Sequence, residues 1–583
     1  MANERDIPSD QPKSVATFTV FSGGTEIPKT HHLLSIAVSR EINRIPSATL
    51  VYIDGDPSKQ TFEVSDKPDF EPGREIEIKA GYRSDEQSIF KGMVVRHGIK
   101  ARKGGAVLVV ECRDKAARMT AACKSRYFRD VKDSDLIEEL IDAHGLEKDV
   151  QATTVEHKQV VQYNSTDWDM ALCRAEANGL LSFVKDGKVK LAKPDFSASP
   201  ALTVQYGATV HDLDAEIDAR LQYKAVKGAT WNPADQELGD ATEAADPGVP
   251  DSGNLKPDAL ADVLGEEDFR LYHGGKLEDA EMQAWVDACL LKHRLAKIRG
   301  RVSIDGTAAV EPGKLIELKG VGARFEGKLY VTGVRQVIDK GDWETIIQFG
   351  VDPEWFAETY AVSRPQAGAL LPPIQGLHAG VVTKLEGDPD DNERIQVRIP
   401  IIHKDDDGAW CRLGTLDAGK ERGTFFRPEI GDEVVVGFLD NDPRHGVVLG
   451  MLHSGKHASP EPAKDDNHKK GYQSREKMKL TFDDEKKEVI LETPAGNKIV
   501  VSEDEKKIHL EDQNGNKLTL DKDGVKIESV KDIVFKAPSG DMKADAKNVE
   551  MTGSVGAKVA GSGGTELSLS GSANLKGSMV NIN

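Results

Sequence analysis

The sequence predicts a mainly β protein with minor α content. Short runs of alternating apolar and polar residues recur along the chain, separated by Gly, Pro, Asn and Asp, as is typical of strands and turns. Three segments instead carry apolar residues at helical spacing. Towards the C-terminus, apolar pairs two residues apart recur every seven to ten residues, which indicates a repeat of very short strands.

Length, charge and cysteine content argue against several classes of protein. The 583 residues exceed the size of a single core, so we expect two to four domains. A net charge of -20 argues against a nucleic-acid partner, because binding phosphate needs a basic face. The 5 cysteines are widely spaced without a CxxC pair, which disfavours a disulfide framework or a zinc module. Without a signal peptide or an apolar run of membrane-spanning length, the chain is expected to be made in the cytoplasm.

Residues 1–370 are predicted to mix strands with helices that pack on a core. An acidic, Gly- and Pro-rich segment at 234–258 is expected to be a long exposed loop or mobile insertion. The predicted strands include Ala16–Phe21, Glu75–Ala80 and Val107–Cys112. The predicted helices follow Asp135, run from an N-cap at Thr166 with Asp169 at the third position to Asn178-Gly179, and extend from about Glu278 to Lys297.

Residues 371–455 are predicted to form a small closed barrel of the OB-fold type. Prolines between Pro365 and Gly376 mark its start, and a linker at 456–474 follows it. Five short strands with Gly and Asp turns suit such a barrel. They are Leu377–Lys384, Arg394–Ile399, Ala409–Leu413, Glu433–Leu439 and Gly446–Leu449.

Residues 475–583 are predicted to form a fibre whose strands each place one apolar pair on one face. One chain of such strands cannot enclose a core, whereas three chains wound together can bury their pairs on a common axis and pair every strand edge. We therefore expect a homotrimer. The predicted core residues are Ile499, Ile508, Leu510, Leu518, Leu520, Val525 and Ile527.

Beyond Met551, charge almost vanishes and Gly and Ser dominate. A disordered tail is one interpretation of this composition. The period of two nevertheless persists, as in Leu567/Leu569, and favours an ordered, tapering end. We expect Val580, Asn581, Ile582 and Asn583 to form a small, nearly neutral platform that docks a capping partner, because exposed apolar surface and unpaired strand edges promote aggregation.

No motif predicts a catalytic residue, a cofactor or a metal ligand. Two sequences resemble phosphate-binding loops, but Leu329 and Glu421 stand where Ser or Thr is required. His453 and His457 have metal-ligand spacing but lie among Gly and Pro, where no helix aligns them. The acidic run at 405–407 is flanked by turn residues, so exposed loops are favoured over a cation site or an acid–base pair.

Three segments resemble the VgrG and phage tail-spike family, with most similarity to the spikes of extracellular contractile injection systems. QYNSTDWDMALCRAEANGLL, at Gln162 to Leu181, is similar to the family's Tyr-Asn-x-Thr-Asp-Trp-Asp signature. Pro312 to Gly350 is similar to the second tube-like domain of the family's hub. Arg394 to His453, with RPEIGDEV at its centre, is similar to its barrel. The order of these segments carries the resemblance.

The resemblance implies a hub of two tube-like domains, an OB-fold barrel and a trimeric, intertwined triangular β-prism needle. Such a spike caps the inner tube and contacts tube-initiator and baseplate proteins. A PAAR-like cone sits on the needle, and sheath contraction drives it mechanically through the target membrane. A structural role in a phage-tail-like particle, extracellular after release, is therefore expected, without enzymatic activity. The alternatives are a cell-bound type VI VgrG spike and a glycan-degrading trimeric tailspike.

Overall fold

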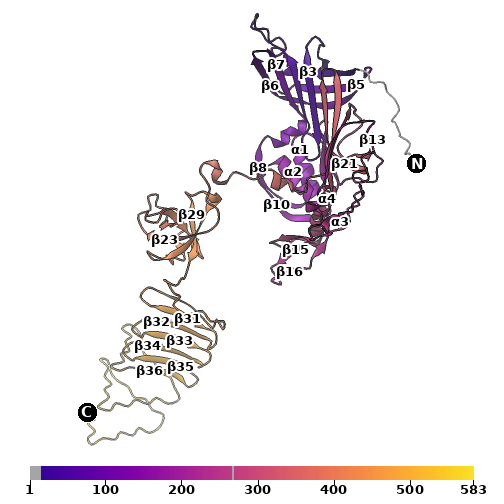
Figure 1. Cartoon of the computed structure of the whole chain (residues 1–583). Helices are drawn as coiled ribbons and strands as arrows, with labels where there is room; N and C mark the ends of the chain where they lie inside the picture. The colour runs from indigo at the N-terminus through magenta and orange to yellow at the C-terminus, as the bar shows by residue number, and fades with distance from the viewer. Residues whose placement is uncertain (1–14, 266–267, 583) are drawn as a thin grey trace. The chain divides into compact units, whose positions relative to one another are not determined.

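A computed structural model describes residues 15–265 and 268–582, which divide into a first compact unit up to Pro373 and a second from Ile374 (Figure 1). The first unit is built on one large sheet with β3 and β21 at its centre. Its strands, in spatial order, are β14 (Val210–Ile217), β19 (Ile298–Asp305), β22 (Asp342–Phe349), β21 (Gly327–Asp339), β3 (Leu33–Glu41), β4 (Ser47–Ile53), β7 (Gly105–Arg113), β6 (Asp85–Arg102), β5 (Glu75–Tyr82), β1 (Ala16–Ser22) and β2 (Thr25–Glu26). β20 (Leu315–Lys319) pairs with β21, and β13 (Leu202–Gln205) with β20.

Smaller sheets and helices complete the first unit. The sheets are β8 (Cys123–Lys132) with β10 (Glu156–Thr166); β9 (Glu147–Val150) with β12 (Lys188–Ala192) and β11 (Leu181–Lys185); and β15 (Ala225–Asn232) with β16 (Glu237–Leu238), β17 (Thr242–Glu243) and β18 (Asp268–His273). The helices are α1 (Asp133–Asp142), α2 (Asp167–Ala177), α3 (Pro257–Ala261), α4 (Asp279–Leu295) and α5 (Phe356–Thr359). As predicted, Thr166 caps α2, its Oγ1 accepting a hydrogen bond from the Asp169 amide at 3.1 Å.

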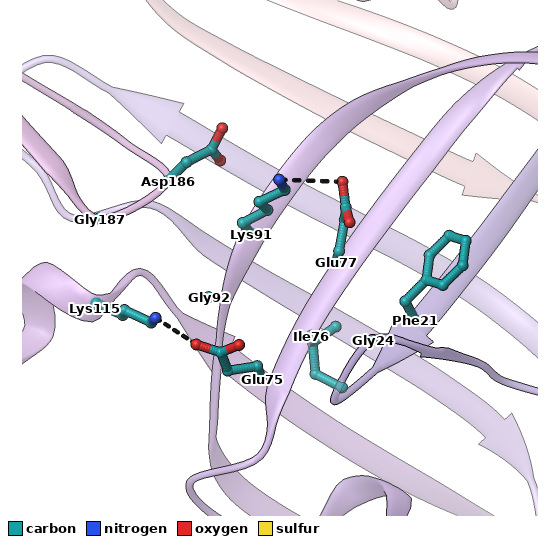
Figure 2. A pocket seen from close by; sticks show the side chains of 10 residues that line it. All are labelled: Phe21, Gly24, Glu75, Ile76, Glu77, Lys91, Gly92, Lys115, Asp186 and Gly187. Carbon is teal, nitrogen blue, oxygen red and sulfur yellow. Dashed lines mark ion pairs between the residues drawn. The ribbon is translucent and has the colours of Figure 1, made fainter.

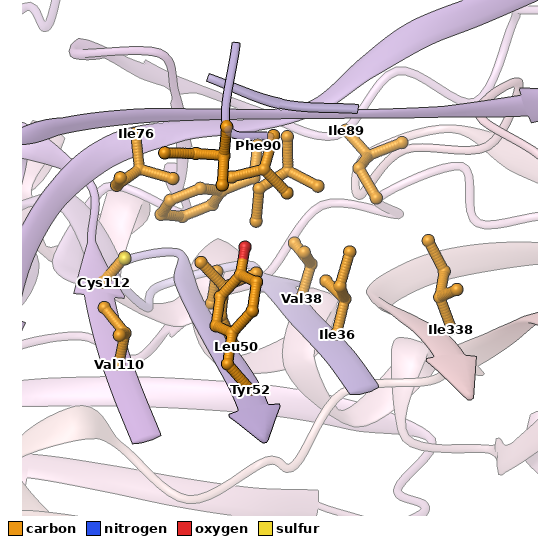
Figure 3. Packing of buried hydrophobic residues seen from close by; sticks show 14 of the residues in the cluster. Ile36, Val38, Leu50, Tyr52, Ile76, Ile89, Phe90, Val110, Cys112 and Ile338 are labelled. Atoms are coloured by element: carbon orange, nitrogen blue, oxygen red, sulfur yellow. The ribbon is translucent and has the colours of Figure 1, made fainter. Parts of the chain in front are cut away.

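Separate apolar cores lie in the two halves of the large sheet. The core of the first half gathers side chains from β3 to β7 (Figure 3). The ring of Phe70, from the short helix Pro68–Phe70, packs on that of Tyr52 with centroids 5.0 Å apart and a tilt of 43°. The core of the second half lies between β19, β20, β21 and β22. The two halves join where β3 pairs with β21 in an antiparallel register that sets Arg335 opposite Ser39.

The acidic segment 234–258 is more closely attached to the first unit than predicted. β16 and β17 both pair with β15, and Ser252 is buried. The Ser252 hydroxyl donates to the Lys328 carbonyl at 2.5 Å, and the Gly253 amide donates to the Glu326 carbonyl at 2.8 Å. Most of the segment is exposed, as predicted, but these contacts attach it to the first unit at β15 and at Ser252.

The second unit holds a closed barrel and a stacked sheet. The barrel contains β23 (His378–Lys384), β24 (Ile395–Arg398), β25 (Ala409–Leu413), β29 (Gly446–Met451) and β28 (Glu433–Phe438), each within two residues of the predicted strand. A hairpin of β26 (Ala418–Gly419) and β27 (Arg422–Gly423) interrupts it. The stacked sheet contains β30 (Lys469–Gln473), β31 (Lys479–Asp483), β32 (Glu488–Glu492), β33 (Lys498–Ser502), β34 (Lys507–Glu511), β35 (Lys517–Asp521) and β36 (Gly524–Glu528).

The predicted mainly β fold with minor helix is thus confirmed, including the OB-type barrel and the C-terminal strand repeat. One local expectation was wrong, because β30 lies inside the predicted linker 456–474. Tyr472 pairs there with Leu480 of β31, so the repeat begins one strand earlier than its regular apolar pairs indicate. The predicted outer limits 1–370, 371–455 and 475–583 stay predictions.

A buried carboxylate ties three helices of the first unit together. Asp133, at the start of α1, accepts two hydrogen bonds from Arg174 of α2, at 2.6 and 2.9 Å, and one from Asn178 at 2.8 Å. Arg174 also donates to Glu281 of α4 at 3.2 Å. Burial raises the pKa of Asp133, but the hydrogen bonds and charge of Arg174 outweigh it, so the pKa is lowered overall.

We expect Asp133→Ala to lower the free energy of unfolding of the first unit by about 1–3 kcal/mol, because the half-buried Arg174 guanidinium loses the carboxylate that accepts two of its hydrogen bonds, while its contact with Glu281 remains. Asp135→Ala, at an exposed position of the same helix turn, is the matched control and should change stability by less than about 1 kcal/mol. Chemical denaturation of both variants in the full chain measures this.

The lowered pKa also fixes a pH dependence. A carboxyl whose pKa falls on folding stabilises the fold above its unfolded pKa of about 3.9 and loses that contribution as pH falls through the folded value. The stability gap between the parent and Asp133→Ala should therefore be full at pH 7 and narrow below about pH 4. A gap unchanged from pH 7 to pH 3 would contradict the assignment of Asp133 as an ionised partner of Arg174.

Candidate functional site

The stacked sheet β30 to β36 carries most of its apolar side chains on one face, while Ile490 and Val500 lie on the other. Successive side chains of a strand point to opposite faces, so the second and fourth residues of each five-residue strand share a face. The register aligns them in two columns. One column is Leu480, Leu491, Ile499, Leu510, Leu518 and Ile527, and the other is Phe482, Val489, Val501, Ile508, Leu520 and Val525. We call these twelve residues the apolar face.

The apolar face is not covered within one chain. Ile499 and Ile508 are each 40% exposed, and Val525 is 68% exposed. Leu510, Leu518 and Leu520 are half-buried, and Ile527 is exposed, so all seven predicted core residues lie on this one face without being buried in it. A single sheet layer cannot cover both of its faces, and a contiguous exposed apolar surface of this kind marks an interaction site. Whether these residues form a core stays a prediction.

The opposite face and the two edges of the sheet are mostly polar. On the opposite face, His509 lies 3.0 Å from the Thr519 hydroxyl. At one edge, Lys517 donates to Glu511 across adjacent strands at 3.0 Å, and this hydrogen bond is the largest cause of a lowered Glu511 pKa. The sheet therefore has one apolar face and one mostly polar face, as expected for a wall that separates a core from water.

Tight turns set the strand register. The Asp512 carboxylate accepts hydrogen bonds from the amides of Asn514 and Asn516, both at 2.9 Å, and these contacts lower the pKa of Asp512 to about 2. Gly515 has a φ of 88° and Gly496 a φ of 94°, which side chains with a Cβ rarely adopt. The turns thus place each apolar pair directly opposite the next, which a one-residue slip would reverse.

Residues 529–582 contain no strand in the structure described, although the period of two predicted strands there. Val580 is 50% and Ile582 82% exposed, and Asn581 is exposed as well, while Asn583 lies outside the described residues. Strands of one apolar pair each leave both edges of the backbone unpaired unless another chain supplies partners. A single chain therefore does not test the predicted platform.

The other candidates from the sequence lie in turns. Gly327 and Lys328 of the first phosphate-loop-like sequence begin β21, and the second leads into β26. The Ser454 amide donates to the His457 carbonyl at 2.9 Å in a turn outside any helix. Asp407 is paired with Lys384 at 2.6 Å. Within 15–265 and 268–582, no cluster of three or more His, Cys, Asp or Glu side chains is arranged to hold a metal ion.

One cavity of about 210 Å³ lies in the first unit between β5, β6 and the loop that joins β11 to β12 (Figure 2). Its charged groups are largely paired: Lys91 lies 3.5 Å from Glu77, and Lys115 binds Glu75. The hydrogen bond from Lys115 lowers the pKa of Glu75, which keeps this carboxyl ionised. These charges therefore bind each other across the cavity wall.

The partly and fully buried thiols are poor nucleophiles. Burial raises the pKa of Cys112 and Cys289 to about 12 and that of Cys173 and Cys411 to about 11. The thiolate is the reactive form, so these groups are almost wholly unreactive at neutral pH.

None of the helices in the described part of the chain is long and apolar enough to cross a bilayer.

A family described as Alg8 N-terminal domain matches residues 12–340, which is more than half of the chain. The chain belongs to the Alg8 N-terminal domain family. A second family, described as the type VI secretion system/phage-baseplate injector OB domain, matches residues 378–453, the span of the closed barrel. The OB-fold predicted from the five strands is therefore confirmed.

Curated relatives include type VI secretion system spike proteins of Pseudomonas aeruginosa. VgrG1b is 25% identical over 188 residues, covering 30% of this chain and 25% of the relative. VgrG1c is 28% identical over 104 residues, covering 17% and 14%. The chain thus spans about a quarter, or less, of the length of these relatives. The predicted resemblance to the VgrG and phage tail-spike family is confirmed.

Solved structures with a similar arrangement come from tail and secretion proteins. A tail protein of Neisseria meningitidis MC58 aligns with a TM-score of 0.44 and 15% identity, covering 58% of this chain and 98% of that one. An E. coli component of the type VI secretion system aligns with a TM-score of 0.38 and 12% identity, covering 74% and 99%.

Proposed function

We propose that this chain is the structural spike and hub of a contractile injection system, which caps the inner tube and forms the membrane-puncturing tip. The observation that carries the proposal is the uncovered apolar face on a sheet of seven stacked strands. An OB-type barrel precedes this sheet in the chain, and a region of the Alg8 N-terminal domain family precedes the barrel. That order suits a hub, a collar and a needle.

Three copies of the chain cover the apolar face. Set around a common axis, three such sheets form a triangular prism with polar outer walls and an apolar interior. Each copy has twelve half-covered apolar side chains to bury, at about 1 kcal/mol each, which amounts to on the order of 10 kcal/mol per copy. This is comparable with the association cost of roughly 4–15 kcal/mol, so the needle contributes a large part of what a trimer needs.

The partners of this spike follow from the family resemblance. We infer that the first unit contacts the inner tube, tube-initiator proteins and baseplate proteins, and that a PAAR-like cone caps the needle. The particle is phage-tail-like and released from the cell. The similarity to the type VI VgrG proteins of Pseudomonas aeruginosa favours a cell-bound type VI spike as the second candidate.

We expect Ile508→Asp or Leu518→Asp to abolish trimerisation, because three carboxylates would then surround one apolar axis. Thr519→Asp, on the opposite face between the two columns, is the matched control and should still assemble. Light scattering of the purified full chain measures the mass. A trimer in Ile508→Asp that melts like the parent would show that the apolar face points outward.

Removal of Val580 to Asn583 should leave the trimer intact and abolish capture of the PAAR-like cone. The exposed Val580 and Ile582 side chains supply the apolar docking surface. A pull-down with the purified cone compares the truncated trimer with a Lys576→Ser trimer, which changes a neighbouring polar position as a control. Undiminished capture by the truncated trimer would place the docking surface elsewhere.

We also propose that the spike acts without enzymatic chemistry. The paired charges of the cavity and the raised pKa of the buried thiols support this proposal. Purified trimer should release no oligosaccharide from bacterial surface glycans beyond the background of the boiled protein, as measured by a reducing-end assay. Release that rises in proportion to trimer concentration would favour a glycan-degrading tailspike instead.

A further inference from the structure

The two edges of the stacked sheet carry different charge sequences. We call the first the ladder edge and the second the mixed edge. The ladder edge contains Gln473, Lys479, Glu492, Lys498, Glu511, Lys517 and Glu528, and the mixed edge contains Lys469, Asp483, Glu488, Ser502, Lys507, Asp521 and Gly524. From Lys479 on, charge alternates strictly along the ladder edge, which is what cross-strand attraction within one sheet favours.

Each strand has one end residue at the ladder edge and the other at the mixed edge. These two residues are too far apart to form an ion pair with each other. Lys507 and Glu511 are the two ends of β34, separated by four residues of extended chain, or about 13 Å. Within its own chain, Lys507 of the mixed edge pairs with Glu505 in the preceding turn and not with Glu511, so its side chain and that of Glu511 remain at separate edges of the sheet. In a closed three-fold arrangement of identical sheets, the ladder edge of one copy meets the mixed edge of the next.

We propose that these edge charges set the alignment between neighbouring copies. At each corner of the prism, the ladder-edge end of a strand in one copy then meets the mixed-edge end of the equivalent strand in the next copy. The inference rests on the proposed trimer and specifies how its copies are arranged. It assigns the two edges as interaction surfaces whose partner is a second copy of this chain, with Glu511 of one copy beside Lys507 of the next.

We call the arrangement in which equivalent strands of two copies face each other the level alignment. The number of opposite-charge pairs distinguishes it from alignments shifted by one strand. With equal strands facing each other, three opposite-charge pairs form: Lys479 with Asp483, Glu511 with Lys507, and Lys517 with Asp521. A single like pair, Glu492 with Glu488, opposes them. The Glu488 carboxylate accepts a hydrogen bond from Ser502 at 2.9 Å in its own chain, which moderates that repulsion.

Shifting one copy by one strand, about 4.8 Å, makes like-charge pairs outnumber opposite-charge pairs, whichever way along the stack the copy is shifted. In one direction only Lys479 meets an acid, while Lys498 meets Lys507 and Glu511 meets Asp521. In the other direction only Lys498 meets an acid, and four like pairs form. Like charges directly opposite each other are destabilising, so the edges favour one alignment and disfavour both shifts.

Cysteine pairs that share position 507 test the alignment. In a Cys123→Ser background, which removes an exposed thiol, the level variant is Lys507→Cys with Glu511→Cys. The two shifted variants combine Lys507→Cys with Lys498→Cys or with Lys517→Cys. In every variant the two positions lie on opposite edges of one sheet, about 13 Å or more apart, whereas a disulfide needs Cα atoms within about 7 Å. Only a bond between copies can form.

We expect mild oxidation to convert the level variant into covalent dimers and trimers on a non-reducing gel, with at least a tenfold higher initial rate than either shifted variant. A faster reaction in a shifted variant would overturn the inference. So would a trimer by light scattering in which none of the variants cross-links, because the edges would then not meet. A parent protein that is monomeric by light scattering would overturn the proposed trimer itself, which separates the two failures.

Discussion

The second unit depends on one constraint: a single layer of strands has two faces, and one chain buries a face only where it closes on itself or folds another element over that face. In the barrel, five strands close on themselves, so Val434, Val436 and Val448 are wholly buried. In the stacked sheet the same kind of residue, such as Ile508, stays 40% exposed. Similar apolar residues therefore form a buried core in the barrel and an exposed apolar face in the stacked sheet, because only the barrel closes.

The first unit meets this constraint within its own chain. Its large sheet is coated by apolar side chains from two halves, and α1 and α2 pack against a further core that includes Leu136 and Trp168. Its buried Asp133 carboxylate is paired with Arg174. The first unit thus buries its apolar side chains within one chain, whereas the apolar face of the stacked sheet is buried only in the proposed trimer.

Local patterns made much of this architecture predictable. The barrel strands, the cap at Thr166 and the apolar pairs of the C-terminal repeat follow from period, turn residues and capping chemistry. Pairing between distant segments was not predictable, since no local signal announces that β3 meets β21 or that Ser252 is fixed by Lys328. Nor was β30, whose Lys-Lys-Gly-Tyr-Gln sequence has one apolar residue in place of a pair.

The edge charges show how a polar residue without a catalytic or metal-binding role still carries specific information. The sequence alone does not distinguish them, because Lys and Glu at strand ends are typical of ordinary solvated positions, and the alternation appears only when the strand register places Lys498 beside Glu511. Apolar columns attract any apolar surface and so drive association without fixing it. Charges at the strand ends restrict which alignment of neighbouring sheets fits, which lets a sheet with an uncovered apolar face favour its own copies over other chains.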